Sequence, residues 1–246
     1  MIAPTPVWLL ETWEQGLGCS ILDRARLLLE RAASGGEEEQ VGQLSVGDGD
    51  WRLIELHETV FGPCFQAVCR CPRCRETMEL NFEKNALRAK AAGPVSTKER
   101  RHLRAEGHDV TFRLLTLADL AAVAGESDPA AARTRLLERC VLGAATAEGP
   151  VASKELPDSI VAELSQAMQR LDPQACIHLQ LRCPSCEHQW PCIFDIAAYL
   201  WSELHHWAQN LLREVHALAR AYGWSEGQIL ALSPQRRRHY LELILA

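Results

Sequence analysis

Two Cys-Pro-x-Cys motifs give this chain four thiols at a spacing that suits metal binding. Cys71 and Cys74 form the first motif, Cys183 and Cys186 form the second, and 108 residues separate the two motifs. A Cys-x-x-Cys turn presents two thiolates on one side, and zinc prefers four such ligands in a tetrahedron. We therefore expect one structural zinc ion, bound by all four cysteines, that closes the long loop between the motifs. Four protein ligands leave no coordination position for water, so this ion is expected to stabilise the fold without taking part in catalysis.

Two other interpretations of the motifs stay open: thiol redox or iron–sulfur chemistry, and turns that bind no metal. A reactive cysteine typically lies at the N-terminus of a helix, whereas alternating strand residues flank both of these turns, which favours a metal. Cys69 is the chief rival ligand, because it precedes Cys71 by two residues and shares its face of a strand. Leu181 takes the equivalent place in the second motif, so Cys69 is interpreted as a packing residue. His188 is interpreted as an exposed turn residue rather than a ligand.

The sequence around each motif predicts a strand, a tight turn and a second strand. Apolar residues alternate within residues 65–82 and again within residues 177–194, as expected for strands with one buried face. Aligned on their cysteines, the two segments match at three further positions: Arg70 with Arg182, Pro72 with Pro184, and Phe82 with Phe194. This short internal repeat predicts a small zinc ribbon that is split in two by a long insertion.

Helical periodicity covers most of the remaining chain. Residues 34–50 are rich in Gly and Glu and predict a loop, and residues 110–115 predict one strand in the insertion. Ser, Thr, Asp and Pro at suitable positions mark the starts of helices. The expected helices are two within residues 7–33, of which Ser20 caps the second, one over 51–61, a short one capped by Thr116, one over 128–142, one over 157–171, one over 195–222, and two short ones that begin at Ser225 and Ser233.

Together these patterns predict an α+β fold that is mostly helical. We expect the parts to form one compact unit. The expected parts are an N-terminal helical region (residues 1–62), the split four-cysteine zinc ribbon (63–84 and 176–195), a mainly helical insertion (85–175) and C-terminal helices (196–246).

The composition is that of an ordinary folded protein, with 47% apolar and 24% charged residues among 246. The first twenty residues lack the pattern of a secretory signal, and no stretch approaches the roughly 18 apolar residues of a membrane-spanning helix. We therefore expect a cytoplasmic protein with no membrane partner. The net charge of −6 argues against a nucleic-acid partner, which calls for a concentrated basic face. Two local basic runs, residues 98–104 and 236–238, are interpreted as solvated helix faces.

No common catalytic motif occurs in the sequence. The patterns HExxH, GxxxxGK[ST] and GxSxG and the dinucleotide-binding fingerprint are all missing. His57–Glu58 and His205–His206 lie in amphipathic helical patterns and are interpreted as ordinary surface or half-buried residues. We therefore expect no enzymatic activity and no small-molecule substrate.

The last fifty residues are rich in aromatic side chains, which could form a core or a docking surface. Trp201 and Trp207 fit helical core positions. Trp224 lies beside a turn, and it is therefore the best candidate for contact with a partner.

The C-terminal sequence, residues 195–245, resembles the baseplate hub assembly chaperone family of contractile-tailed phages and phage-tail-like contractile injection systems. The shared pattern is a long helix that ends in an aromatic-rich turn, then Trp224–Ser225–Glu226, Ile229–Leu230, and an Arg-rich helix that reaches Tyr240–Leu241. Residues 50–56, Phe61–Gly62–Pro63 and the first Cys-Pro-x-Cys motif are similar to bacterial tail-cluster relatives.

This resemblance implies a nonenzymatic protein that assists assembly of the baseplate or hub. Its expected partners are baseplate, hub or spike proteins of a phage-like tail. Arg236, Arg237 and Tyr240, which belong to the shared pattern, join Trp224 as expected partner-binding residues. Two other functions stay open: a zinc-ribbon adaptor in transcription or RNA metabolism, and a CxxC thiol oxidoreductase.

Overall fold

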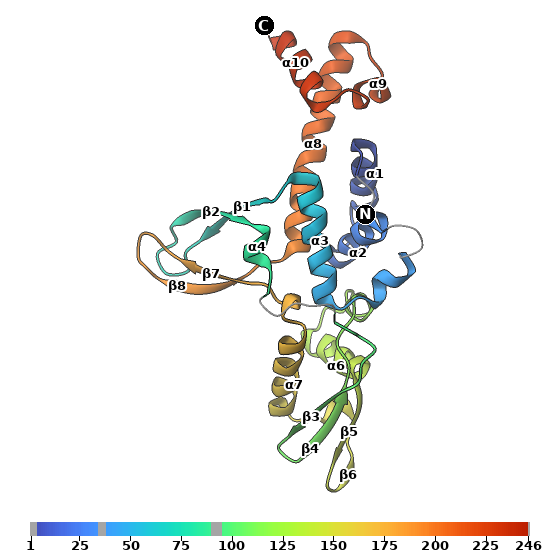
Figure 1. The fold of residues 1–246 in the computed structure, drawn as a ribbon, viewed down its shortest axis with the longest axis vertical. Helices are drawn as coiled ribbons and strands as arrows, with labels where there is room; N and C mark the ends of the chain where they lie inside the picture. Colours follow the sequence, from blue (N-terminus) through green and yellow to red (C-terminus); the bar gives the residue numbers. More distant parts are fainter. Residues whose placement is uncertain (1–3, 34–37, 90–94, 246) are drawn as a thin grey trace.

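Three N-terminal helices and the long helix α8 form the body of the molecule (Figure 1). The computed structural model describes residues 4–33, 38–89 and 95–245. The predicted α+β class is confirmed, since 55% of the structure is helical and the strands form small antiparallel sheets. The elements of the body are α1 (Pro6–Gly16), α2 (Ile21–Ala32), the 3₁₀ segment η1 (Glu38–Gln43), α3 (Val46–Phe61) and α8 (Ile196–Tyr222), whose apolar faces share the largest cluster of buried side chains.

Helix α3 begins at Val46, inside the stretch that the sequence predicts as a loop (residues 34–50). Residues 34–37 of that stretch lie outside the described part of the chain. The loop prediction rested partly on Gly47, but this glycine serves close packing: a Cβ atom there would lie 1.9 Å from Oδ1 of Asp172. The backbone N–H of Gly47 donates to the same carboxylate at 2.9 Å. Asp172 therefore holds the start of α3 against the end of the insertion.

Two β-hairpins project from one side of the body (Figure 1). Each hairpin is a separate two-stranded antiparallel sheet, and its tight turn carries one Cys-Pro-x-Cys motif. The predicted strand, turn and strand around each motif are therefore confirmed. The first hairpin is β1 (Cys64–Arg70) with β2 (Thr77–Glu83), followed by the short helix α4 (Lys84–Leu87), and the second is β7 (His178–Arg182) with β8 (Gln189–Ile193).

Aromatic side chains join the hairpins to the body at their base. Phe65 of β1 stacks on Phe82 of β2, and Phe194 meets both rings edge-on. Tyr199 of α8 packs against Phe65. The hydroxyl of Tyr199 donates to the backbone oxygen of Gln66 at 3.0 Å and accepts from the N–H of Gln66 at 2.9 Å. These contacts fix both hairpins relative to α8.

The insertion between the hairpins contains more helical than strand residues, as predicted, but it holds a four-stranded antiparallel sheet where the sequence predicts one strand. The strand predicted at residues 110–115 overlaps β4, which lies at His108–Phe112. Strand β5 contains Gly and Ala, which are weak strand formers, and the structure of β3 and β5 is decided by their pairing with β4. Helix α7 packs on this sheet around Val110, Ile160 and Val161. The elements are β3 (Arg101–Ala105), β4 (His108–Phe112), α5 (Leu117–Ala121), α6 (Pro129–Cys140), β5 (Val141–Thr146), β6 (Gly149–Pro150), η2 (Ser153–Glu155), α7 (Asp158–Leu171) and η3 (Pro173–Ala175).

The buried carboxylate of Asp119 ties the helices of the insertion to its sheet. It accepts hydrogen bonds from Arg113, just after β4, at 2.6 and 3.0 Å, and from Arg139 of α6 at 2.7 Å. It also completes the predicted cap of α5 with Thr116. Burial raises the pKa of the Asp119 carboxyl, but the hydrogen bonds from Arg113, Thr116 and Arg139 outweigh burial and hold that pKa well below its usual range.

Helix α8 continues beyond the body and carries two short helices at its end (Figure 1). Its 27 residues span about 40 Å. It ends at Gly223, whose φ of 70° is the left-handed conformation expected of a helix C-cap. Two further helices follow, α9 (Glu226–Leu230), which begins with the predicted Ser225 cap, and α10 (Pro234–Leu245). We call residues 209–245 the C-terminal cap.

The molecule is branched, where the sequence predicts one compact unit. Figure 1 shows the hairpins, the insertion and the C-terminal cap extending from the body in different directions. The physical reason is that buried side chains form separate clusters, one in the body, one in the insertion, one between α1 and α8, and one between the hairpins. The hairpins and the insertion therefore each have a small core apart from that of the body.

Candidate metal centre

The two Cys-Pro-x-Cys turns have the same backbone structure. In the first, the N–H of Cys71 donates to the oxygen of Glu76 and the N–H of Arg75 donates to the oxygen of Cys71, both at 2.9 Å. In the second, Cys183 donates to His188 at 2.9 Å and Glu187 donates back to Cys183 at 3.0 Å. Arg75 and Glu187 have φ values of 62° and 56°, so both turns place a non-glycine residue in the left-handed region. The sequence repeat is therefore also a structural repeat.

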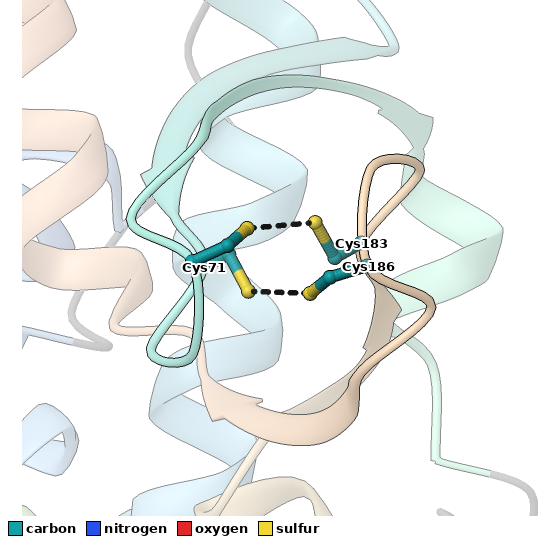
Figure 2. A group of neighbouring side chains, drawn as sticks. Cys71, Cys183 and Cys186 are labelled. Atoms are coloured by element: carbon teal, nitrogen blue, oxygen red, sulfur yellow. Dashed lines mark hydrogen bonds between the residues drawn. The ribbon is translucent and has the colours of Figure 1, made fainter.

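The four predicted ligands come together in space. The sulfur atoms of Cys71, Cys74, Cys183 and Cys186 all lie within 4.8 Å of one another. The Sγ atoms of Cys71 and Cys186 are 3.7 Å apart, and those of Cys74 and Cys183 are 3.5 Å apart (Figure 2). A tetrahedral site with metal–sulfur bonds of about 2.3 Å has sulfur–sulfur edges of about 3.8 Å. The cluster is therefore already close to the size of a four-thiolate metal site, and it could hold a metal ion.

In the first turn, burial raises the pKa of the two cysteine thiols, whereas hydrogen bonds from backbone amides lower it. Burial raises the pKa of Cys71, but the backbone amides of Cys74 and Arg73 more than offset it and lower the pKa to about 7. The amide of Glu76 lowers the pKa of Cys74, whereas burial and the neighbouring thiols raise it, to about 12 overall. Four thiols this close disfavour one another's ionisation, and a bound divalent cation removes that penalty.

The two rival ligands lie beside the cluster and outside it. Cys69 packs against Cys71 and Met78 between the hairpins, and burial there, together with neighbouring thiols, raises its pKa. The ring of His188 stacks on Trp190 with centroids 5.7 Å apart. Among the described residues, the four-cysteine cluster is the one group of His, Cys, Asp and Glu side chains close enough to share a metal ion.

Arg75 and Glu187 are the residues of this site that the sequence reasoning missed. Each lies directly after the second cysteine of its motif, at equivalent places in the repeat. Their left-handed backbone lets the chain turn back so that the amide of the first cysteine reaches its carbonyl partner. A glycine at these places would have signalled the turn, but Arg and Glu gave no such signal.

Arg237 does not lie on the surface where a partner could reach it. It is 4% exposed, its Nε donates to Glu214 at 2.9 Å, and its Nη1 donates to the backbone oxygen of Leu232 at 2.9 Å. This corrects the expectation that Arg237 contacts a partner, because its charge is neutralised inside the C-terminal cap. The sequence pattern predicts that the whole arginine run is exposed, because Glu214, the partner of Arg237, lies 23 residues away and gives no local sign of the ion pair.

The other three expected partner-binding residues lie in the same cap. Trp224 stacks on Tyr222 with ring centroids 4.6 Å apart, and Tyr240 meets Trp224 edge-on at 4.9 Å. Trp224 and Tyr240 are half-buried, and Arg236 is exposed. The structure brings Trp224 and Tyr240 into contact, and the binding of all three residues to a partner stays a prediction.

No protein-family model, curated protein or solved structure matches this chain. The resemblance to baseplate hub assembly chaperones therefore stays a prediction from sequence. Within the described residues, no helix is long and apolar enough to cross a membrane.

Proposed function

We propose that this chain is a nonenzymatic protein, stabilised by one zinc ion in a split ribbon, that assists assembly of the baseplate or hub of a phage-like contractile tail or injection system. The observation that carries the proposal is that the segment with the family resemblance includes a part of the molecule that projects from the body (Figure 1). The segment with the family resemblance, residues 195–245, includes the end of α8 together with α9 and α10, which extend away from the body. That part of the molecule is free to meet another protein.

The arrangement of the cluster supports a structural role for the metal. Four sulfur ligands saturate a zinc ion, so no position is left for a substrate or an activated water. The donors are all thiols, which zinc accepts readily, and their spacing needs little adjustment. The two halves lie on separate hairpins, and 108 residues separate Cys74 from Cys183, so the ion would join segments that are far apart in the sequence.

Co-purification with candidate partners tests the proposed function. We expect the tagged, zinc-loaded chain to retain one or more of the hub, spike and baseplate wedge proteins of a contractile tail encoded in the same genome. A variant that lacks residues 224–245 keeps all of α8 with its C-cap Gly223, serves as the control, and is expected to lose them. Deletion of the chain should yield particles without complete baseplates, as seen by electron microscopy. Normal particles after deletion would contradict the proposal.

A second candidate, a nucleic-acid adaptor, is favoured by one observation on the first hairpin. Arg70, Arg73 and Arg75 are exposed around the cysteine turn. A cluster of this kind can contact phosphates. If it does, single-stranded RNA or DNA should shift in a gel with strong salt dependence, and Arg73→Glu should weaken the shift. Without such a shift this candidate falls.

A further inference from the structure

The C-terminal cap has the opposite charge from the rest of the chain. It contains five arginines and three glutamates, with no Lys or Asp, in a protein whose net charge is −6. One pair, Arg237 with Glu214, is neutralised in its interior. The remaining arginines of the cap are exposed: Arg213, Arg220, Arg236 and Arg238. Against these four arginines the cap exposes two glutamates, Glu226 and Glu242, so its surface carries an excess of positive charge on an acidic molecule.

Apolar side chains lie among these charges. Leu243 is 67% exposed, and Ile244 and Tyr222 are each 38% exposed. On α10, Arg236, Tyr240 and Leu243 follow one another at spacings of four and three residues, which places them along one side of the helix. We call the surface formed by Tyr222, Trp224, Arg236, Tyr240, Leu243 and Ile244 the cap patch. Exposed apolar groups that are rimmed by charge are typical of binding surfaces.

The aromatic rings of the patch are arranged for apolar packing rather than for base stacking. Tyr222 lies almost parallel to Trp224, at 17°, and Tyr240 meets Trp224 at 83°. These contacts occupy the indole of Trp224, whereas proteins that bind single-stranded nucleic acid offer open ring faces to successive bases. The cluster therefore favours a protein partner over a nucleic acid.

We infer that the cap patch binds an acidic amphipathic segment of a partner protein. Aliphatic or aromatic residues of that segment cover Leu243, Ile244 and the edge of the aromatic cluster, and its carboxylates face Arg236. Arg238 lies two residues further along α10, on the other side of the helix, and adds positive charge at longer range. Complementary charge selects the partner and speeds its encounter, while the buried apolar residues supply most of the affinity. The inference deepens the proposed function, because it names the binding surface and the chemistry of the partner. It rests on that function in one respect, namely that the partner is a protein.

Peptide binding to the full-length, zinc-loaded chain tests this inference. The probe is a fluorescein-labelled peptide of about 20 residues with Leu on one helical face and Glu on its flanks. Two control peptides are used: one has Lys in place of Glu, and the other has the same residues in scrambled order. Anisotropy at about 50 mM salt should show at least tenfold tighter binding of the acidic amphipathic peptide than of either comparison, and weaker binding as salt rises.

Variants of the patch and a matched control locate the binding. The double variant R236E/R238E and the single variant L243D should each bind the acidic peptide at least tenfold more weakly. The control K98E/R100E makes the same change of charge on other exposed residues and should bind as the wild type does. Unchanged thermal midpoints show that each variant is folded, which is expected because all five side chains are exposed.

Several outcomes overturn the inference. The first two are equal affinity for the Glu and Lys peptides and binding by R236E/R238E that is as tight as that of the wild type. The third is tighter binding of a single-stranded DNA oligonucleotide than of the acidic peptide. The fourth is a wild-type dimer that L243D dissociates, which would assign the patch to a second copy of this chain. Peptide binding without capture of hub, spike or wedge proteins overturns the proposed function alone. Capture that R236E/R238E leaves intact overturns the inference alone.

Discussion

The four cysteine ligands make the most direct prediction at the scale of single residues. Cys71→Ser should remove nearly all bound zinc and lower the free energy of unfolding by on the order of 3 kcal/mol or more, because three thiolates hold zinc poorly and the hairpins lose their link. Elemental analysis for about one zinc per chain, together with urea unfolding, measures both effects.

Cys69→Ser is the matched control for this loss. Cys69 lies beside the cluster without belonging to it, so its variant should keep about one zinc ion per chain. If Cys69→Ser lost the metal while Cys71→Ser retained it, the ligand assignment would be wrong.

His57 makes stability depend on pH. It is fully buried at the base of the first hairpin, its ring stacks on Phe65 at 4.0 Å, and its nitrogens have no hydrogen-bond partner among the described residues. Burial lowers its pKa to about 4. The unfolded chain, with a histidine pKa of about 6.5, therefore binds more protons between pH 4 and 6.5.

Stability should accordingly fall as the pH drops from about 6.5 to 4, by up to about 3 kcal/mol from His57 alone. His57→Phe keeps a ring against Phe65 and removes the titrating group, so its unfolding free energy should change less over this range and should equal or exceed that of the wild type at pH 7. Urea titrations at several pH values, with His206→Phe on the surface as control, measure the difference. Identical pH profiles for His57→Phe and the wild type would show that His57 has no such role.

At the scale of elements, the left-handed residue in each cysteine turn carries a conformational cost. A non-glycine residue in this region destabilises the folded state by roughly 1–2 kcal/mol. A glycine avoids that strain, but its greater freedom in the unfolded chain offsets about 0.5–1 kcal/mol of the gain. Arg75→Gly and Glu187→Gly should therefore each stabilise the zinc-loaded protein by about 0.5 kcal/mol. Arg73→Gly, in the same turn without a positive φ, should destabilise it by a similar amount. Thermal unfolding of the three variants checks the sign, and a loss in Arg75→Gly would contradict the account.

The start of α3 depends on a glycine for a different reason. Gly47→Ala places a Cβ atom against Asp172 and the backbone nitrogen of Ala175, and it disturbs the hydrogen bond between Gly47 and Asp172. We expect a loss of about 2 kcal/mol or more in the free energy of unfolding. Gly42→Ala is the control, since its new Cβ meets its nearest neighbour at an ordinary 3.5 Å. Equal stability of the two variants in urea would show that Asp172 moves aside at little cost.

The elements also show what sequence can and cannot predict. Ser20, Thr116 and Ser225 cap helices where the sequence predicts them, because a cap depends on residues three positions apart. The strands β3 and β5 were missed because their pairing with β4 comes from contacts across the sheet. The cluster of four cysteines was predictable from the sequence repeat, whereas the burial of Arg237 depends on a glutamate one helix away.

At the scale of the whole molecule, separate cores predict separate responses to metal removal. A single hairpin is only marginally stable in water, so we expect β1–β2 and β7–β8 to depend on the aromatic base near Tyr199 and on a metal ion bound by the cluster. The insertion has its own core around Val110 and Ile160. After chelation, amides of the hairpins should exchange with solvent faster, while those of β4 and β5 keep most of their protection.

Hydrogen exchange with mass spectrometry measures this difference region by region. The Cys71→Ser variant should reproduce the chelated pattern without chelator. Equal loss of protection in the hairpins and the insertion would instead mean that the metal holds the entire molecule in one cooperative unit.

The distance along the chain between the two halves of the cluster has a consequence during synthesis. Cys74 leaves the ribosome 109 positions before Cys183. At roughly 5–20 residues per second, the first two thiols wait on the order of ten seconds for their partners. The strand order within the insertion lets that segment fold during the wait, whereas α8, which completes the core of the body, is made only after the second turn. A nascent chain therefore exposes half of the candidate metal site to the cell, and a metal ion that arrived during synthesis would meet two thiols before it met four.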